Sequence, residues 1–356
     1  MTSVELKKLR DQRLPTATLG GSLSPDCDSV AAACMDGVYR LELESGAKER
    51  LHSHQSYASS AHWLSDGTIL SGGYDGQLRW FDVNSKQLLR NQKLHDFWSW
   101  QTAVSPDGEL FASVTGQYLA GGYKYEPAPQ REPSVCVGSI KTGEIIHRLP
   151  HVPSVQSVAF SPDGQFVAAG NLMGEVRVYD VRVGEMANRF TTPDFTSWGI
   201  IKSHCYLGGI FALRFTPNGD ELLLAGMGPM RDPMAGNGRQ LWQKWKWDLP
   251  TPQLTDQTHE GESGEGLMEA LALHPSGKFF AMGGRLRGGE WNVAVFSLER
   301  GDRLATLKTG YRATTLQFTP DGRSLVVMGT HNQSSKIKDG KFGDFGHLEE
   351  YSVAIT

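Results

Sequence analysis

Histidines at a regular spacing are the first residues that could do chemistry in this chain of 356 residues. His54, His95 and His151 could bind a metal ion, because imidazole is the commonest protein ligand of transition metals. Each of the three lies ten residues before a copy of one recurring tetrapeptide. That equal spacing places them in three different repeats, so they do not form one ligand set. We predict no metal and no cofactor.

Two further constellations lack a necessary part. His204 and Cys205 are neighbours, and adjacent side chains of an extended chain point to opposite faces, so the two do not chelate together. A thiol nucleophile also needs a base and an orienting group, which the sequence does not show. The glycine-rich run 226–238 lacks the Lys-Ser/Thr of a phosphate-binding loop and does not open a helix. It predicts a folded lid in which Arg231 pairs with Asp232.

An acidic cluster, Glu260, Glu262, Glu265 and Glu269, follows His259. The pattern favours a solvated loop, with a weak cation site as the alternative. No set of nucleophile, base and orienting residue emerges from any of these motifs. We therefore predict that the protein is not an enzyme.

The elements that must position any site follow from a repeated turn. Its seven copies begin at residues 24, 64, 105, 161, 216, 274 and 319 and read SPDC, LSDG, SPDG, SPDG, TPNG, HPSG and TPDG. Proline presets φ, Asp or Asn tolerates the turn, and Gly takes positive φ. Short apolar runs, such as 155–160 and 166–170, flank each copy and predict a buried hairpin.

A second recurring element predicts a third strand in each repeat. Its pattern is apolar-x-apolar-aromatic-Asp/Ser-apolar, best seen in LRWFDV at 78–83 and VRVYDV at 176–181. The period-2 alternation is typical of strands, and a turn with a fourth strand follows, as at 143–149. Four short strands repeated seven times are typical of a β-propeller.

These residues resemble the WD40-repeat family over nearly the whole chain, best in the fourth repeat with His151, SVQSVAFSPDGQFVAAG and GEVRVYDV. Most Trp-Asp pairs are replaced, so no subfamily is identified. The resemblance implies an all-β fold, a seven-bladed WD40-type propeller forming one domain over 1–356. It also implies that His54, His95 and His151 each brace their own blade. The expected blades are 14–53, 54–94, 95–150, 151–190, 191–257, 258–308, and 309–356 together with 1–13.

The last repeat ends at its third strand, near Tyr351 to Ile355, and therefore lacks a fourth. Ser3 to Leu6 alternates like an edge strand and is expected to supply it. That pairing would remove an exposed strand edge from the last blade.

The copies of the turn are 40 to 58 residues apart, and the excess over about 40 residues lies in long connections. The resemblance implies that these connections open on one face, and we expect function there, centred on 117–134, 227–245 and 285–291. Aromatic and arginine side chains are typical of binding surfaces. The candidate binding residues are Trp98, Trp100, Tyr123, Phe211, Arg231, Trp242, Glu269, Arg285, Arg287 and Trp291.

Composition excludes several classes of partner. A net charge of −4 gives no basic footprint for nucleic acid, and no apolar run is long enough for a signal peptide or a membrane span. The four cysteines form no C-x-x-C pair, which predicts free thiols and a cytoplasmic location.

The function predicted from the sequence is that of a non-catalytic scaffold that binds protein partners through the loop-bearing face. The first alternative is recognition of a small ligand or glycan in an aromatic pocket. The second is a hydrolase that uses charged loop residues. A broad aromatic surface would favour the scaffold, and a deep pocket with converging charges would favour the hydrolase.

Overall fold

The computed structural model describes residues 3–121, 124–195, 209–230, 238–262, 266–285, 289–331 and 344–356. The regular elements among these residues are all β-strands except one helical turn, the short 3-10 element η1 (Pro193–Phe195). The strands form seven four-stranded antiparallel sheets, which are blades of the β-propeller type, as the sequence predicts. The arrangement as one domain with the expected blade bounds stays a prediction.

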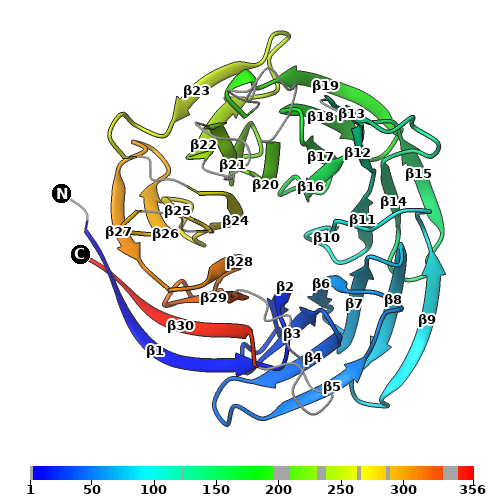
Figure 1. The fold of residues 1–356 in the computed structure, drawn as a ribbon, viewed down its shortest axis with the longest axis vertical. Coiled ribbons are helices and arrows are strands. Elements are labelled where there is room, and N and C mark those ends of the chain that lie inside the picture. Colours follow the sequence, from blue (N-terminus) through cyan, green and yellow to red (C-terminus); the bar gives the residue numbers. More distant parts are fainter. Residues whose placement is uncertain are drawn as a thin grey trace. The chain divides into compact units, whose positions relative to one another are not determined.

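The described chain divides into two compact units (Figure 1). The first comprises Met1–Ser99, Ala270–Arg285 and Trp291–Thr356. Its sheets are β2 (Thr18–Leu23), β3 (Ser29–Cys34), β4 (Gly37–Glu42) and β5 (Lys48–His52); β6 (Ala58–Trp63), β7 (Thr68–Gly73), β8 (Gln77–Asp82) and β9 (Gln87–Lys93); β24 (Met268–Leu273), which begins at the unit boundary, β25 (Phe279–Gly284), β26 (Val293–Ser297) and β27 (Arg303–Leu307); and β28 (Arg312–Phe318), β29 (Ser324–Thr330), β30 (Gly346–Ile355) and β1 (Val4–Leu14).

The second unit comprises Trp100–Glu269 and Leu286–Glu290. Its sheets are β10 (Gln101–Val104), β11 (Leu110–Val114), β14 (Val135–Ser139) and β15 (Ile145–Leu149); β16 (Val155–Phe160), β17 (Phe166–Asn171), β18 (Glu175–Asp180) and β19 (Glu185–Thr191); and β20 (Gly209–Phe215), β21 (Glu221–Met230), β22 (Gly238–Lys246) and β23 (Gln253–Gln257). A small hairpin, β12 (Tyr118–Gly121) and β13 (Lys124–Pro127), occupies part of the long connection before β14.

The repeated turn joins the first two strands of every sheet. Its fourth residue donates its N–H to the first residue's carbonyl in all seven copies, as in Gly164 to Ser161 at 2.9 Å. That fourth residue has positive φ in each copy, including Cys27 at 62°, where the other six copies have glycine. The Ser161 hydroxyl also donates to Asp163, whose carboxylate accepts the Gln165 N–H. Local turn chemistry therefore determines each hairpin.

A β-bulge interrupts the first strand at the position five residues before the turn. Register shifts skip Leu19, Ser59, Gln156, Phe211 and Thr314, each of which is the extra residue opposite its second strand. A bulge bends the strand and re-aims one side chain. Each of the seven repeats has a residue five before its turn, and in five of the repeats this residue is thus structurally equivalent.

Neighbouring sheets of each unit pack through buried apolar side chains. Ala31 and Val38 of one sheet join Ala61, Ile69 and Phe81 of the next in one cluster. In the second unit, a cluster combines Val178 and Phe190 with residues of the β20–β23 sheet. Both faces of the inner strands are covered in this way, which explains why the second strands are almost uninterrupted apolar runs.

Strand β1 completes the sheet of β28, β29 and β30, which confirms the predicted pairing of the two end segments of this chain. The register runs from Val4 opposite Ile355 to Leu14 opposite Gly346, so the strand is longer than the sequence indicates. A bulge at Leu9 interrupts the pairing. The Ser3 and Thr356 main chains exchange two further hydrogen bonds of 2.8 and 3.1 Å.

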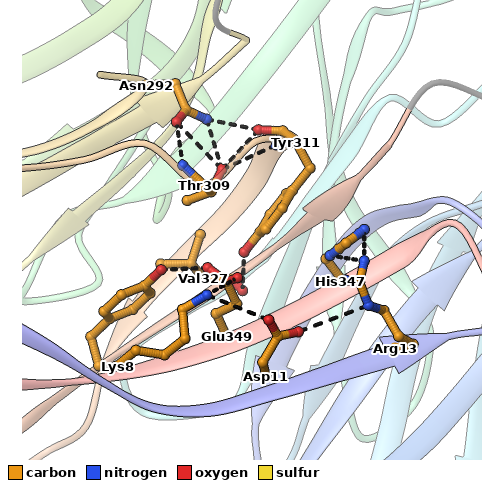
Figure 2. A network of polar contacts seen from close by, with 10 residues as sticks. Lys8, Asp11, Arg13, Asn292, Thr309, Tyr311, Val327, His347 and Glu349 are labelled. Carbon is orange, nitrogen blue, oxygen red and sulfur yellow. Dashed lines mark hydrogen bonds and ion pairs between the residues drawn. The ribbon is translucent and has the colours of Figure 1, made fainter. Parts of the chain in front are cut away.

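Charged side chains reinforce this pairing, as Figure 2 shows. The Lys8 ammonium lies 2.5 Å from Glu349, whose side chain is 3% exposed. The Tyr351 hydroxyl also donates to Glu349, and Arg10 pairs with the buried Glu350. Each glutamate of β30 therefore has a cation of β1 as its partner.

Candidate functional site

The two ends of each blade differ, and this decides where a site can be built. In the β6–β9 sheet, Ala58 lies opposite Gly73 and Trp63 opposite Ile69. The chain that enters the first strand and the connection from the second strand to the third therefore meet at one end, which we call the loop end. The repeated turn lies at the other end.

Four aromatic rings contact one another at the loop end of the β6–β9 sheet, three of them stacked and the fourth tilted. The rings of Tyr74 and Trp98 are parallel within 4° with centroids 4.5 Å apart, and Phe97 stacks on Trp98 at 5.0 Å. Tyr57 extends the group, with its centroid 5.9 Å from that of Tyr74. Tyr57 and Trp98 are 41% and 38% exposed. We call Tyr57, Tyr74, Phe97 and Trp98 the aromatic stack.

Main-chain hydrogen bonds hold the stack in place. Tyr74 donates its N–H to the Tyr57 carbonyl at 2.8 Å, which ties together the main chains of these two residues. The segment that carries Trp98 is bound to the β7–β8 connection, because His95 donates to Gly76 and Ser99 donates to Gly73. Gly76 has a φ of 71°, and a Cβ there would lie 2.2 Å from the His95 carbonyl oxygen. Glycine therefore permits the close approach of the two segments.

A buried polar network adjoins the stack in the chain, because Asp75 directly follows Tyr74. His54 Nδ1 lies 3.0 Å from Asp75 and its Nε2 lies 2.9 Å from the Ser71 hydroxyl, so the ring bridges the carboxylate and the hydroxyl. Asp75 also accepts the main-chain N–H groups of Gln55 and Gln77. Burial raises the pKa of Asp75, but the hydrogen bonds and charge of His54 and these N–H groups outweigh it and lower the pKa to about 2. The carboxylate therefore stays ionised.

The order Ser71, His54, Asp75 is also the order of a serine-hydrolase triad. The side chain of His54 is 0% exposed and Ser71 is fully buried in strand β7. No substrate can reach a nucleophile in that position. The network braces the blade, and this confirms the predicted role of His54; His151 likewise bonds within its own blade, to the Ala169 carbonyl.

The second histidine of this region, His52, is kept neutral. Burial lowers its pKa to about 3, and the nearby charges of His54 and Arg79 add to that effect. Its Nε2 lies 3.3 Å from the Ser71 hydroxyl. Within the described part of the chain, no group of three or more His, Cys, Asp or Glu side chains could hold a metal ion.

The structure separates the predicted binding residues into exposed and buried sets. Trp98 belongs to the aromatic stack, and Arg285 is exposed. Trp242 and Trp291 are 1% and 6% exposed, so their indoles are buried. The Arg303 guanidinium lies over the Trp291 ring at 5.4 Å.

Three other predicted residues lie at the start of first strands and are half-buried. Trp100 donates its indole N–H to the Gly116 carbonyl at 2.9 Å and packs on an apolar cluster. Phe211 is the bulge residue of β20, and Glu269 lies in β24. Tyr123, Arg231 and Arg287 lie outside the described residues, as do His204 and Cys205.

The sequence analysis missed Tyr57, Tyr74 and Phe97. A signal for the first two was present, because each is the aromatic residue directly outside a predicted strand at the same end of one blade. Pairing the first strand with the second brings such flanking residues together.

The matches to known proteins follow the same repeats. The model of the WD domain, G-beta repeat, matches residues 47–82 and 143–180, each of which spans the fourth strand of one blade and the first three strands of the next. The chain is a member of the WD40-repeat family. The first matched segment of this WD40 protein contains Tyr57, Tyr74 and the braced pair of His54 and Asp75.

Several proteins are similar in sequence to part of this WD40 protein. Telomerase protein component 1 of Rattus norvegicus is 28% identical over 167 residues, 46% of this chain and 6% of that protein. Apoptotic protease-activating factor 1 of Rattus norvegicus is 27% identical over 138 residues, 38% of this chain and 10% of that protein. Actin-interacting protein 1 of Drosophila melanogaster is 28% identical over 193 residues, 44% of this chain and 29% of that protein. The chain thus spans less than a third of the length of each of these relatives.

Across the described ranges, no helix of this WD40 protein is long and apolar enough to cross a membrane.

Proposed function

We propose that this WD40 protein is a non-catalytic interaction scaffold and that a protein partner docks on the aromatic stack. The observation that carries the proposal is the exposure of Tyr57 and Trp98 within the aromatic stack, a cluster of four contacting rings. Tyrosine and tryptophan are the residues most enriched among those that dominate binding energy at interfaces. A broad aromatic surface on the loop end fits the scaffold better than the small-ligand or hydrolase alternatives.

Preorganisation supports the same proposal. Main-chain hydrogen bonds hold the segments that carry the stack, and Asp75, next to Tyr74, binds the main chain of Gln55 and Gln77, so the rings keep their positions before a partner arrives. A preformed surface loses little side-chain freedom on binding, and this lowers the entropic cost of association. The same position in the blade is also where the family resemblance predicts the binding face.

Alanine substitution of the two exposed rings tests the proposal. Trp98→Ala is expected to weaken binding of a partner, first isolated from lysate with the wild-type chain and then purified, by about 30-fold or more, because hot-spot truncation costs about 2 kcal/mol or more. Tyr57→Ala is expected to weaken it less. The melting temperature should stay within a degree or so of the wild type.

Leu89→Ala is the matched control, because Leu89 is an exposed apolar side chain on β9 of the same sheet. It is expected to leave the affinity unchanged. Full binding by the Trp98→Ala, Tyr57→Ala double variant would refute the site while leaving the scaffold role open to another surface.

We also propose a reducing, cytoplasmic location. Its support is that Cys27, Cys34 and Cys136 are free thiols.

A further inference from the structure

Arg214 of β20 is a half-buried cation that has no acidic partner among the described residues. Its guanidinium carries five N–H donors, and its one hydrogen bond within the described part of the chain is to the adjacent Leu213 carbonyl, at 2.7 Å. Burial lowers the pKa of Arg214, and no acidic side chain of the described residues opposes that effect. Arginine does not deprotonate in proteins, so the side chain stays charged.

The acidic side chains on the same face of the sheet are engaged elsewhere. Arg214 is opposite Leu223, which in turn is opposite Lys244, so these residues share a face with Glu221 and Asp256. Glu221 accepts from Thr255 at 2.7 Å with one oxygen and lies 4.0 Å from Lys244 with the other. Asp256 lies 3.3 Å from His259. Neither carboxylate neutralises Arg214.

The position of Arg214 has a structural role in two other repeats, and an arginine cannot fill that role. The residues two before the turn in the other repeats are Ser22, His62, Ala103, Ala159, Ala272 and Gln317. In the first unit, Ser22 accepts the Trp63 N–H and Gln317 accepts the Leu23 N–H, so each caps the main chain of a neighbouring first strand. An arginine side chain has no acceptor and cannot do this.

We propose that Arg214 is the anchor of an oxyanion-binding site that takes a carboxylate or phosphate group. A partly desolvated charge is unfavourable unless it is paired, and pairing is stronger there than in water. Arginine forms bidentate hydrogen bonds with both oxyanions. Arg214 is half-buried rather than sealed, so an anion can reach it from solvent. This site goes beyond the proposed scaffold function and lies in a different blade from the aromatic stack.

Thermal unfolding in a buffer without oxyanions provides the first test. Arg214→Met should melt at a higher temperature than the wild type, because methionine removes an unpaired charge and keeps the length of the side chain. A lower melting temperature for Arg214→Met would show that the guanidinium has a structural role, and it would overturn the proposal.

Titration with probes provides the second test. Inorganic phosphate and citrate are the free anions, and hexaglutamate represents an anion carried on a chain, each at matched ionic strength against chloride. The wild type should show a saturable rise of about 2–4 °C at about ten times the dissociation constant. The rise should be absent in Arg214→Met and reduced in Arg214→Lys.

Arg182→Met is the matched control, because Arg182 is exposed on the turn between β18 and β19 of the same unit. It should respond like the wild type. A response to the free anions identifies a small-molecule source, and a response to hexaglutamate alone identifies a chain-borne one. No response to any probe, or equal responses in all variants, would overturn the proposal.

Discussion

The ion pair between Lys8 and Glu349 ties β1 to β30, and its removal should destabilise the protein measurably. The two charges are 2.5 Å apart, the carboxylate is 3% exposed, and the Lys8 side chain is 44% exposed (Figure 2). Lys8→Met would leave the Glu349 carboxylate buried beside the neutral hydroxyl groups of Tyr351 and Tyr311 and without its cation.

The magnitude follows from this geometry. Breaking a fully buried ion pair from one side costs about 3–5 kcal/mol, because an unpaired charge stays behind. Because the Lys8 ammonium is half-exposed, water can take over part of its interaction with Glu349 once it is removed. We therefore expect the free energy of unfolding to fall by about 2 kcal/mol. The double variant Lys8→Met, Glu349→Gln should recover part of that loss, since it removes both charges.

A double-mutant cycle by urea denaturation measures the coupling. Lys7→Met is the control, because Lys7 is exposed on the same strand and has no ion-pair partner in the described residues. It should change the free energy of unfolding by less than about 0.5 kcal/mol. Equal effects of Lys7→Met and Lys8→Met, or a coupling energy near zero, would refute the reasoning.

The pH dependence has a definite sign. Burial lowers the pKa of Lys8, but the hydrogen bond and charge of Glu349 outweigh it, so the pKa is raised from 10.5. The stabilisation is therefore fully present below pH 10.5 and is lost as the pH rises through the folded-state value. Lys8→Met should remove this alkaline dependence.

Three further predictions follow from the turns, the brace and the thiols. Asp75→Asn should lower the free energy of unfolding by about 2 kcal/mol at pH 7, since the pKa of Asp75 is lowered to about 2 from 3.8. The wild type, but not the variant, should lose that stability as the pH falls from about 4 to 2. Parallel curves of unfolding free energy against pH for the two proteins would contradict this. Cys27→Gly should raise the free energy of unfolding by about 0.5–1 kcal/mol in urea titrations, because Cys27 has a φ of 62° where glycine is unstrained; an equal gain in Cys27→Ala would show that the backbone is not the cause. Burial raises the pKa of Cys34 to about 12 and that of Cys136 to about 11, so alkylation of the native protein at pH 8 should modify the half-buried Cys27 before these two. Equal rates for the three thiols in mass spectrometry would contradict the burial.

The repeating parts of this fold could be predicted from the sequence because their causes are local. The tetrapeptide of Ser161 to Gly164 forms its hairpin through bonds within six residues. The alternation at 176–181 marks strand β18, which spans Glu175–Asp180. Even the pairing of β1 with β30 was predictable, since the last repeat lacks a strand and the first residues alternate.

The tertiary structure decided which predicted site residues are accessible. Trp98 and Trp242 look alike as loop tryptophans in the sequence, yet one is 38% exposed in the aromatic stack and the other 1% exposed in its sheet. Tyr57 and Tyr74 meet because their strands pair, and no spacing in the chain specifies which rings then stack.

The pairing of charged side chains belongs to the same class of property. Glu349 and Arg214 are both charged residues within β-strands. The sequence around them gives no sign that Glu349 has an ion-pair partner and that Arg214 has none among the described residues. Turn type and strand period depend on a few consecutive residues. Burial, pairing and exposure depend on the neighbouring strand or sheet, which comes from far away along the chain, so the sequence alone determined the blades and the folded structure determined the surfaces between and upon them.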